Sequence, residues 1–405
     1  MSNRIRLILI SVSSVIVMYI VVGGVLGKSA SKTGHDETYR DLGVYSEVLS
    51  RINSDYVTEP DLSKVTDGAI RGLLEALDPY STYFTPAEFK DYMAHPDPGP
   101  AGVGIFFSKR YGYAPVVSVL PGSPAEKAGI KPGDLLDRVG DSPTRELSVV
   151  QIKRLLGGAP GTSVTLWVVR EARGEPEKIE LTRAVSNDLP VVGEMKDEGT
   201  GYIRVATFEK GTTEKVAAKL KELTAQGATK VVLDLRNCAG GDPQEAVSTA
   251  SLFLSKGLIV AYTEGQRSPR QNLMARPEGA VSNLPLAVLI NRSTAGAAEI
   301  VADGIAGNQR GDVVGIPSFG VGVVEKVVPV GDGSGLLLAV AKYYGPDGKA
   351  IEDNGVTPNV LMTSPDETGG LADETTPEQF GGKDDKTLQK AIDVLKQKSV
   401  PAKAA

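Results

Sequence analysis

The chain is poor in the side chains that most hydrolytic and metal sites require. Its 405 residues include one cysteine, Cys238, and two histidines, His35 and His95. A single cysteine excludes a disulfide within the chain and a cysteine-rich zinc site. Both histidines precede the first β-rich module, which argues against a Ser-His-Asp triad, and there is no His-Glu-x-x-His motif. We therefore expect neither a metal nor a cofactor.

Clustered positive charge is also scarce. The sequence has 44 Lys and Arg against 50 Asp and Glu, giving a net charge of −6, and the basic residues form no block. Because phosphate binding requires clustered Lys and Arg on one face, we do not expect nucleic acid as a partner. Aromatic residues make up only 5% of the chain, and the 46 glycines indicate many turns and small-residue packing.

The N-terminus has one long uncharged run. Arg4 and Arg6 precede residues 7–27, which carry no charge and end at Lys28. This run is long enough to cross a bilayer as a helix and is longer than the apolar part of a usual signal peptide. The arginines favour a cytoplasmic N-terminus. We expect an uncleaved anchor that contacts the membrane through 7–27, with the bulk of the chain on the periplasmic or extracellular side; cleavage near Gly27 is the alternative.

Hydrophobic periodicity and turn residues predict a multidomain chain of mixed α/β and α+β class. The expected divisions are a transmembrane signal anchor at 1–27, a tether at 28–37, a helical domain at 38–95, a β-rich module at 101–184, an α/β core at 190–362, a flexible connector at 363–384 and a C-terminal helix at 385–398. In the core we expect strands at 202–208, 230–235, 286–290 and 336–344, and helices at 213–226, 245–254 and 297–310.

The β-rich module has a recognisable loop. Gly102-Val103-Gly104-Ile105-Phe106-Phe107, followed by the segment 123–134 with its Gly133-Asp134 pair, resembles a PDZ domain. The resemblance implies that loop amides at Gly102, Val103 and Gly104 hold the terminal carboxylate of a peptide, which adds a strand to the sheet edge. Ile105 and Phe107 would line the pocket for an apolar last residue. The alternative is a PDZ fold that serves only as a scaffold or lid.

Four further motifs follow one another along the chain. They are Leu77-Asp78-Pro79-Tyr80-Ser81, the Asp234-Leu235-Arg236-Asn237 run with Gly240-Gly241, the small-residue run that ends at Glu299, and Ser318-Phe319-Gly320-Val321-Gly322. Their order resembles the C-terminal processing peptidases, or tail-specific proteases. In that family the nucleophilic serine lies three residues before the glutamate, the base is a lysine between the two glycines, and a glutamine follows four residues on.

In this chain the three reactive positions hold other residues. The resemblance assigns the serine position to Gly296, the lysine position to Val321 and the glutamine position to Glu325, and 296 and 321 have the spacing that the family pattern requires. Gly296 has no side chain, Val321 has no lone pair, and Glu325 would repel an oxyanion. The resemblance also implies an oxyanion hole at Gly240, Gly241 and Ala297. We therefore expect an inactive homologue that binds protein C-termini or unfolded chains, alone or as a homo- or hetero-oligomer.

A displaced dyad is the alternative, in which the chain is an active serine-type endopeptidase. Ser293 or Thr294 would be the nucleophile, and Lys326 or Lys342 the base. Side chains alternate along a strand, so Lys326 is expected to face away from Val321 unless a bulge intervenes, and no local signal indicates one. The simpler interpretation of Ser293 and Thr294 is that they cap the helix that begins near Ala297.

Overall fold

The computed structural model describes residues 33–170, 174–185, 189, 191–276, 282–362 and 380–399, with side chains described between residues 40 and 397. The expected anchor at 1–27 and residues 28–32 of the expected tether lie outside these ranges. Within them, no helix combines the length and the apolar character needed to cross a bilayer. The chain divides into two compact units, Met1–Ile70 and Arg71–Ala405.

The first unit is helical where it is described. Helix α2 spans Thr33–Asp55 and therefore begins inside the stretch expected to be a tether. Helix α3 spans Leu62–Glu75 and ends in the second unit, and its first turn is capped by Asp61, whose carboxylate accepts the Lys64 N–H at 3.1 Å. Several large apolar side chains of α2 are exposed, among them Leu42, Val44 and Val48.

The β-rich module forms a six-stranded sheet with the order β2-β3-β4-β6-β7, and β5 pairs with β4. Alternating buried side chains in the strands and the inner face of α6 build its core, with Val116, Ile152, Leu166 and Val168 fully buried. The elements are β2 (Ile105–Phe107), β3 (Ala114–Val119), α5 (Pro124–Lys127), β4 (Leu135–Val139), β5 (Ser142–Pro143), η1 (Thr144–Glu146), α6 (Val149–Leu156), β6 (Ser163–Val169) and β7 (Pro176–Thr182).

The α/β core is built on a second six-stranded sheet, with the order β17-β14-β13-β10-β9-β8. All its pairings are parallel except that of β8 with β9. The strands are β8 (Val192–Lys196), β9 (Thr200–Arg204), β10 (Lys230–Asp234), β13 (Leu286–Ile290), β14 (Asp312–Gly315) and β17 (Val360–Leu361). The continuous apolar runs of β10 and β13 are buried on both faces, as is usual for parallel strands covered by helices.

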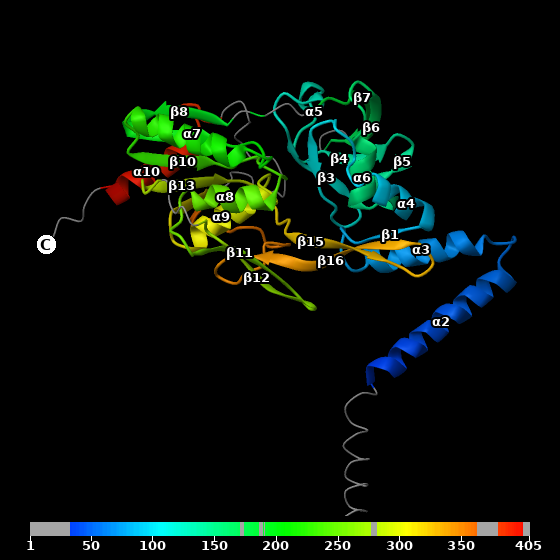
Figure 1. Ribbon diagram of the computed structural model, residues 1–405. Coiled ribbons are helices and arrows are strands. Elements are labelled where there is room, and N and C mark those ends of the chain that lie inside the picture. Colours follow the sequence, from blue (N-terminus) through cyan, green and yellow to red (C-terminus); the bar gives the residue numbers. More distant parts are fainter. Residues whose placement is uncertain are drawn as a thin grey trace, which may run out of the picture. The chain divides into compact units, whose positions relative to one another are not determined.

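Helices cover both faces of this sheet (Figure 1). Helices α7 (Thr212–Ala225), α8 (Pro243–Ser251) and α9 (Ala297–Gly307) pack with Val231, Leu233 and Val288 in one cluster. Helix α10 (Lys386–Ser399) packs on the alternate residues, Val232 and Leu289, through Leu388, Ile392 and Leu395. The C-terminal helix is therefore part of the core.

A third sheet holds elements that the sequence did not reveal. Strand β1 (Thr82–Phe84) lies in the stretch expected to be helical and pairs with β16 (Gly335–Tyr344), which also pairs with β11 (Ile259–Gly265) and β15 (Val323–Pro329). Strand β12 (Ser268–Met274) completes a hairpin with β11, and helix α4 (Pro86–Ala94) follows β1. The β15–β16 pairing contains a bulge, because Val324 faces Ala341 whereas Glu325 faces Ala339, which leaves Val340 as the extra residue.

Candidate functional site

The glycine loop after β10 and the loop after β13 meet at the carboxyl edge of the sheet, where ligands usually bind in open α/β folds. Ala239 and Ala295 form a parallel bridge, and the Ala295 N–H donates to the Cys238 carbonyl at 3.0 Å. A Cβ added at Gly296 would lie 3.7 Å from the Gly240 nitrogen. The position that the resemblance assigns to the nucleophile is therefore next to the loop that it assigns to the oxyanion hole.

The backbone at Gly296 has an unusual conformation, with φ 67° and ψ −120°. Side-chain-bearing residues rarely adopt a positive φ, and such strain is found at functional turns, including the nucleophile turn of other serine hydrolases. Gly296 is the N-cap of α9, so the expected start of this helix at Ala297 is confirmed. The amide of Ala297 belongs to the first turn of α9, where free N–H groups favour negative charge.

The three expected oxyanion-hole residues are not equivalent. Gly240 adjoins Gly296, and Ala297 follows it in the chain. Gly241 instead packs against the backbone of Phe208, with which it forms a bridge, and a Cβ at Gly241 would lie 2.5 Å from the Phe208 carbonyl oxygen. Gly241 therefore fixes the loop, whereas Gly240 and Ala297 are the two that lie next to Gly296.

Glu299 is the central polar residue of the site, a role that sequence reasoning missed. Its fully buried carboxylate accepts hydrogen bonds from the Gly296 N–H at 2.8 Å and the Val321 N–H at 2.9 Å on one oxygen. The other oxygen accepts from the Gly320 N–H at 2.7 Å and the Ser318 hydroxyl at 2.5 Å. Burial raises its pKa to about 7, although these donors act in the opposite direction. Glu299 thus ties positions 296 and 321 together.

A second buried carboxylate completes the turn around Val321. Glu352 accepts the Gly322 N–H at 2.6 Å, and burial raises its pKa to about 7. Three successive amides, those of Gly320, Val321 and Gly322, therefore donate to two carboxylates. Glu352 lies 53 residues from Glu299 in the sequence, and no local pattern marks it as a partner of this turn.

The side chain of Val321 faces an apolar cluster. This cluster, which we call the site cluster, contains Val117, Ala239, Ala295 and Phe319, with Phe106 and Val321 packed against it. Phe106 belongs to β2, and its ring would approach a Cβ at Gly240 to 3.1 Å. Side chains of the β-rich module therefore cover the glycine loop and the position that the resemblance assigns to the base.

The two nucleophile candidates of the displaced-dyad alternative, Ser293 and Thr294, are both buried. Thr294 is fully buried; its hydroxyl donates to the Leu235 carbonyl at 2.7 Å and accepts the Asn291 N–H at 3.0 Å. Ser293 is also buried. The interpretation of these hydroxyls as helix caps is wrong for Thr294, because Glu299 rather than Thr294 accepts the N–H at the start of α9.

The lysines of that alternative lie on the β15–β16 ribbon. Lys326 is exposed on β15, and Lys342 on β16 pairs with Asp353 at 3.9 Å. Glu325, assigned to the glutamine position, is exposed too. The pKa of its carboxyl is raised, mainly by desolvation. The positive charge of Lys153 lowers this pKa, and the negative charge of Asp78 raises it further. Glu325 and Lys326 are both exposed, so burial does not distinguish their faces, and the expected alternation along 321–326 stays a prediction.

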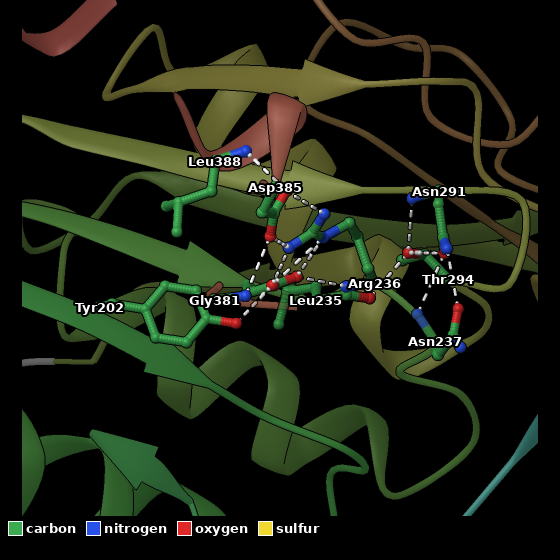
Figure 2. Close-up of polar contacts among 10 residues, drawn as sticks. Tyr202, Leu235, Arg236, Asn237, Asn291, Thr294, Gly381, Asp385 and Leu388 are labelled. Atoms are coloured by element: carbon green, nitrogen blue, oxygen red, sulfur yellow. Dashed lines mark hydrogen bonds and ion pairs between the residues drawn. The ribbon is translucent and has the colours of Figure 1, made fainter. Parts of the chain in front are cut away.

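A buried ion cluster surrounds Arg236, which precedes Asn237 at the start of the glycine loop (Figure 2). The Arg236 guanidinium donates to Asp234 and to Asp385, with contacts of 2.5 Å and 2.6 Å, and all three side chains are buried. The Tyr202 hydroxyl donates to Asp234 at 2.7 Å, and Asp385 accepts the Leu388 N–H at 3.0 Å, which caps α10. Asp385 was missed as a site-supporting residue, although its place before an amphipathic helix is a recognisable capping signal.

Part of the expected peptide loop of the β-rich module makes contacts within the module itself. The Gly102 N–H donates to the Ala184 carbonyl at 3.0 Å, and a Cβ at Gly104 would lie 2.1 Å from the Ser123 Cβ. Val103 and Phe107 are buried in the module, and Ile105 packs against the same core. Among the described residues β2 pairs only with β3, which leaves its other edge available for an added strand.

Polar contacts join this module to the loops of the site. The Arg110 guanidinium donates to the Phe319 carbonyl at 2.5 Å and lies 4.1 Å from the centre of the Phe319 ring. The Ser118 hydroxyl donates to the Asn237 carbonyl at 2.6 Å. The fold therefore places the β2–β3 ribbon against both loops that frame position 296.

Comparisons with known proteins agree with this architecture. Residues 199–362 match the model of Peptidase family S41, and residues 116–170 match that of the PDZ domain. The chain is 32% identical over 343 residues to the carboxy-terminal processing protease CtpA of Bacillus subtilis, covering 84% of this chain and 72% of the relative. It is 30% identical to the carboxy-terminal-processing protease of Bartonella bacilliformis, covering 84% and 79%.

A solved structure of a processing protease also has a fold similar to that of this chain. The photosystem II D1 C-terminal processing protease superposes with a TM-score of 0.64 at 27% identity, covering 78% of this chain and 92% of that one. The chain therefore belongs to the carboxy-terminal processing proteases of peptidase family S41, and its β-rich module is a PDZ domain.

Proposed function

We propose that this chain is a family member without peptidase chemistry at the family site, and that it binds protein C-termini or unfolded chains without cleaving them. The observation that carries the proposal is Gly296, which has no side chain at the point where an added Cβ would face the Gly240 amide at 3.7 Å. Acyl transfer by a serine peptidase needs a hydroxyl at that point and a base that takes its proton. The alignment of the family motifs with 296 and 321 supports this proposal.

The surroundings of Val321 also support it. Its backbone N–H is bound by Glu299 and its side chain packs in the site cluster, so no proton acceptor faces position 296 from this residue. The Gly240 amide and the α9 N-terminus can still hold a carbonyl or carboxylate oxygen. A site with donors and no nucleophile is suited to binding a peptide rather than to cutting it.

The contacts of Thr294 disfavour the alternative of an active endopeptidase. Using Thr294 Oγ1 as a nucleophile would break its bonds with Leu235 and Asn291 in a fully buried place. In the described part of the chain, no lysine amine is hydrogen-bonded to Ser293 or Thr294. The alternative therefore needs a rearrangement that the preferred function does not.

We propose, in addition, that residues 7–27 anchor the chain and place residues 28–405 on the periplasmic or extracellular side. The uncharged run after Arg4 and Arg6 supports this, because positively charged flanks favour the cytoplasmic side. Reporter fusions after residue 30 and after residue 399 test this orientation. Activity of both reporters only in the non-cytoplasmic compartment is expected, and cytoplasmic activity contradicts the anchor.

The function is tested with the full-length chain in detergent micelles and a fluorescent ten-residue peptide that ends in alanine. We expect saturable binding to the free-acid peptide, weaker binding to its C-terminal amide, and no cleavage products by mass spectrometry. Ile105→Ala should weaken binding, whereas Val192→Ala, on the distant edge strand β8, should not. Cleavage that is abolished by Ser293→Ala would instead establish the endopeptidase.

A further inference from the structure

A cavity of about 520 Å³ lies where β2 ends and α6 begins. The turn after β2, residues 109–112, forms one wall, and Arg145 and Ser148, just before α6, form another. A PDZ domain binds a peptide as a strand added to an exposed sheet edge, and β2 is an edge strand of this sheet. The cavity, which we call the β2–α6 cavity, therefore lies at the end of this edge away from the Gly102–Gly104 loop.

Three cationic side chains that line the cavity have no anionic partner among the described residues. Lys109 is 7% exposed and donates to the carbonyls of Arg145 and Leu147, while Arg110 and Arg145 stack on Phe319 and Tyr113. None of the three forms an ion pair with a residue that the structure describes. Burial lowers the pKa of Lys109, and the negative charge of Glu75 opposes this. A buried lysine bound only to carbonyls would gain from a nearby carboxylate.

The acidic residues of the same cavity are less available to a ligand. Asp78 accepts the N–H groups of Tyr80 and Ser81 and the Ser81 hydroxyl. Asp353 pairs with Lys342. Of the lining acids only Glu75 lacks such a bond in the described structure, and it is exposed. The lining therefore carries three carboxylates and three cations, but the oxygens of Asp78 are engaged by these donors, whereas the Arg145 guanidinium has no hydrogen-bond acceptor in the described structure.

The tip of the β2–β3 turn carries a second sign of a binding surface. Tyr111 has a φ of 53° and is 98% exposed, and it is followed by Gly112 with a φ of 79°. Two successive positive φ values are typical of a tight hairpin turn that favours Asn, Asp or Gly at its first position. A fully exposed tyrosine there is strained and has no packing benefit within the PDZ domain, which is the pattern expected of a residue kept for contact with a ligand.

We propose that the β2–α6 cavity binds an acidic side chain of the peptide, about four to six residues before its C-terminal residue, with Arg145 and Lys109 as the charged contacts and Tyr111 covering the chain. The proposal rests on the binding of C-termini by the PDZ domain. The register follows from the strand rise of about 3.3 Å per residue along the stretch from Gly104 to Arg110. The partners are therefore proteins with an apolar C-terminal residue preceded by Asp or Glu.

The test uses the full-length chain and ten-residue peptides that carry one Glu, or Gln at the same place. Glu five residues before the C-terminus should bind about tenfold more tightly than Gln, and Glu eight residues before it should give no such difference. The tenfold preference should vanish in Arg145→Gln and persist in Arg138→Gln, an exposed arginine on β4 of the same domain. It should also shrink as salt is raised.

Tyr111→Gly provides a second variant with a distinctive signature. Relief of the positive φ should raise the melting temperature, whereas loss of the ring should weaken peptide binding several-fold. Equal binding of Glu and Gln peptides, or a Glu preference that survives Arg145→Gln, overturns the cavity proposal while C-terminal binding stands. Equal binding of free-acid and amidated peptides overturns the proposed function itself.

Discussion

Two buried polar clusters support the candidate site, and they are built differently. At Glu299 one carboxylate without a cation accepts four neutral donors, one from Gly296 and three from the segment 318–321. At Arg236 one cation lies between Asp234 and Asp385, and burial, which lowers the pKa of Arg236, is outweighed by Asp234. The first cluster fixes position 296 against position 321, and the second fixes the glycine loop against the C-terminal helix.

The two clusters bear on the proposal that the reactive positions of the family hold other residues in this chain. Neither cluster uses a side chain of Gly296, Val321 or Glu325. The backbone of the site is therefore positioned by groups that take no part in acyl transfer. A chain can keep the loops, the glycine amides and the strained turn while the residues that would perform chemistry are different.

The largest effect is expected from breaking the ion cluster with Arg236→Met. Two buried carboxylates would lose their cation, and this should lower the free energy of unfolding by about 3–5 kcal/mol. Urea unfolding monitored by circular dichroism measures the change. Lys396→Met removes a solvent-accessible cation of α10 that pairs with Glu198 and should change stability far less, because water screens such a pair. Equal losses in the two variants would contradict a buried, coupled cluster.

The next largest effect is expected from Glu299→Ala. It frees three backbone N–H groups and the Ser318 hydroxyl in a buried place, which should cost about 2–4 kcal/mol. Glu352→Ala is the matched control, because it frees the Gly322 N–H of the same turn and should cost about 1–2 kcal/mol. Thermal unfolding compares them, and a smaller loss for Glu299→Ala than for Glu352→Ala would show that the four bonds do not act together.

The two clusters should respond to pH with opposite signs. Because the pKa of Glu299 is raised from 4.5 to about 7, the folded state binds more protons between these values, so stability falls as pH rises through this window and levels off above it. Burial raises the pKa of Asp385, but the hydrogen bonds and charge of Arg236 outweigh burial and leave this pKa below its usual 3.8. The folded state therefore binds fewer protons than the unfolded state there, and stability is lost as pH falls below 3.8.

Unfolding midpoints measured from pH 3 to pH 8 test this contrast. Glu299→Gln should remove about a third of the decline between pH 5 and pH 7, because burial also raises the pKa of Glu352 and of Asp303 to about 7. Asp385→Asn should flatten the acid side alone. A wild-type midpoint that rises from pH 5 to pH 7 would contradict the raised pKa values.

Much of the frame was predictable because it depends on local patterns. The strand at 286–290 and the start of α9 at Ala297 follow from an apolar run and a glycine before an Ala-rich segment. Parallel strands bring their carboxyl ends to one edge, so the meeting of the Gly240 and Gly296 loops follows from the motif order.

The remainder depends on pairings between distant parts of the chain. Strand β1 forms because Thr82–Phe84 pairs with β16, more than 250 residues away; its three residues favour strands, but the run is too short to predict one. Thr294 suggested a helix cap, but the end of β10 offers its hydroxyl the Leu235 carbonyl instead. Likewise, Glu299 in a helix pattern gives no sign that Ser318, Gly320 and Val321 will converge on it.

The smallest effect is expected from placing a hydroxyl in the site with Gly296→Ser. Its Cβ would meet the Gly240 nitrogen at an ordinary 3.7 Å, so the cost is the positive φ alone, about 1–2 kcal/mol. Gly112→Ser, at a positive φ in open space, is the matched control and should cost a similar amount. A fluorophosphonate probe should not label Gly296→Ser, because Val321 supplies no base. Labelling should appear only when Val321→Lys is added, because the apolar site cluster would keep the lysine amine neutral and able to accept a proton. A loss far above that of Gly112→Ser would mean that position 296 has no room for a nucleophile, and labelling of Gly296→Ser alone would mean that another group acts as the base.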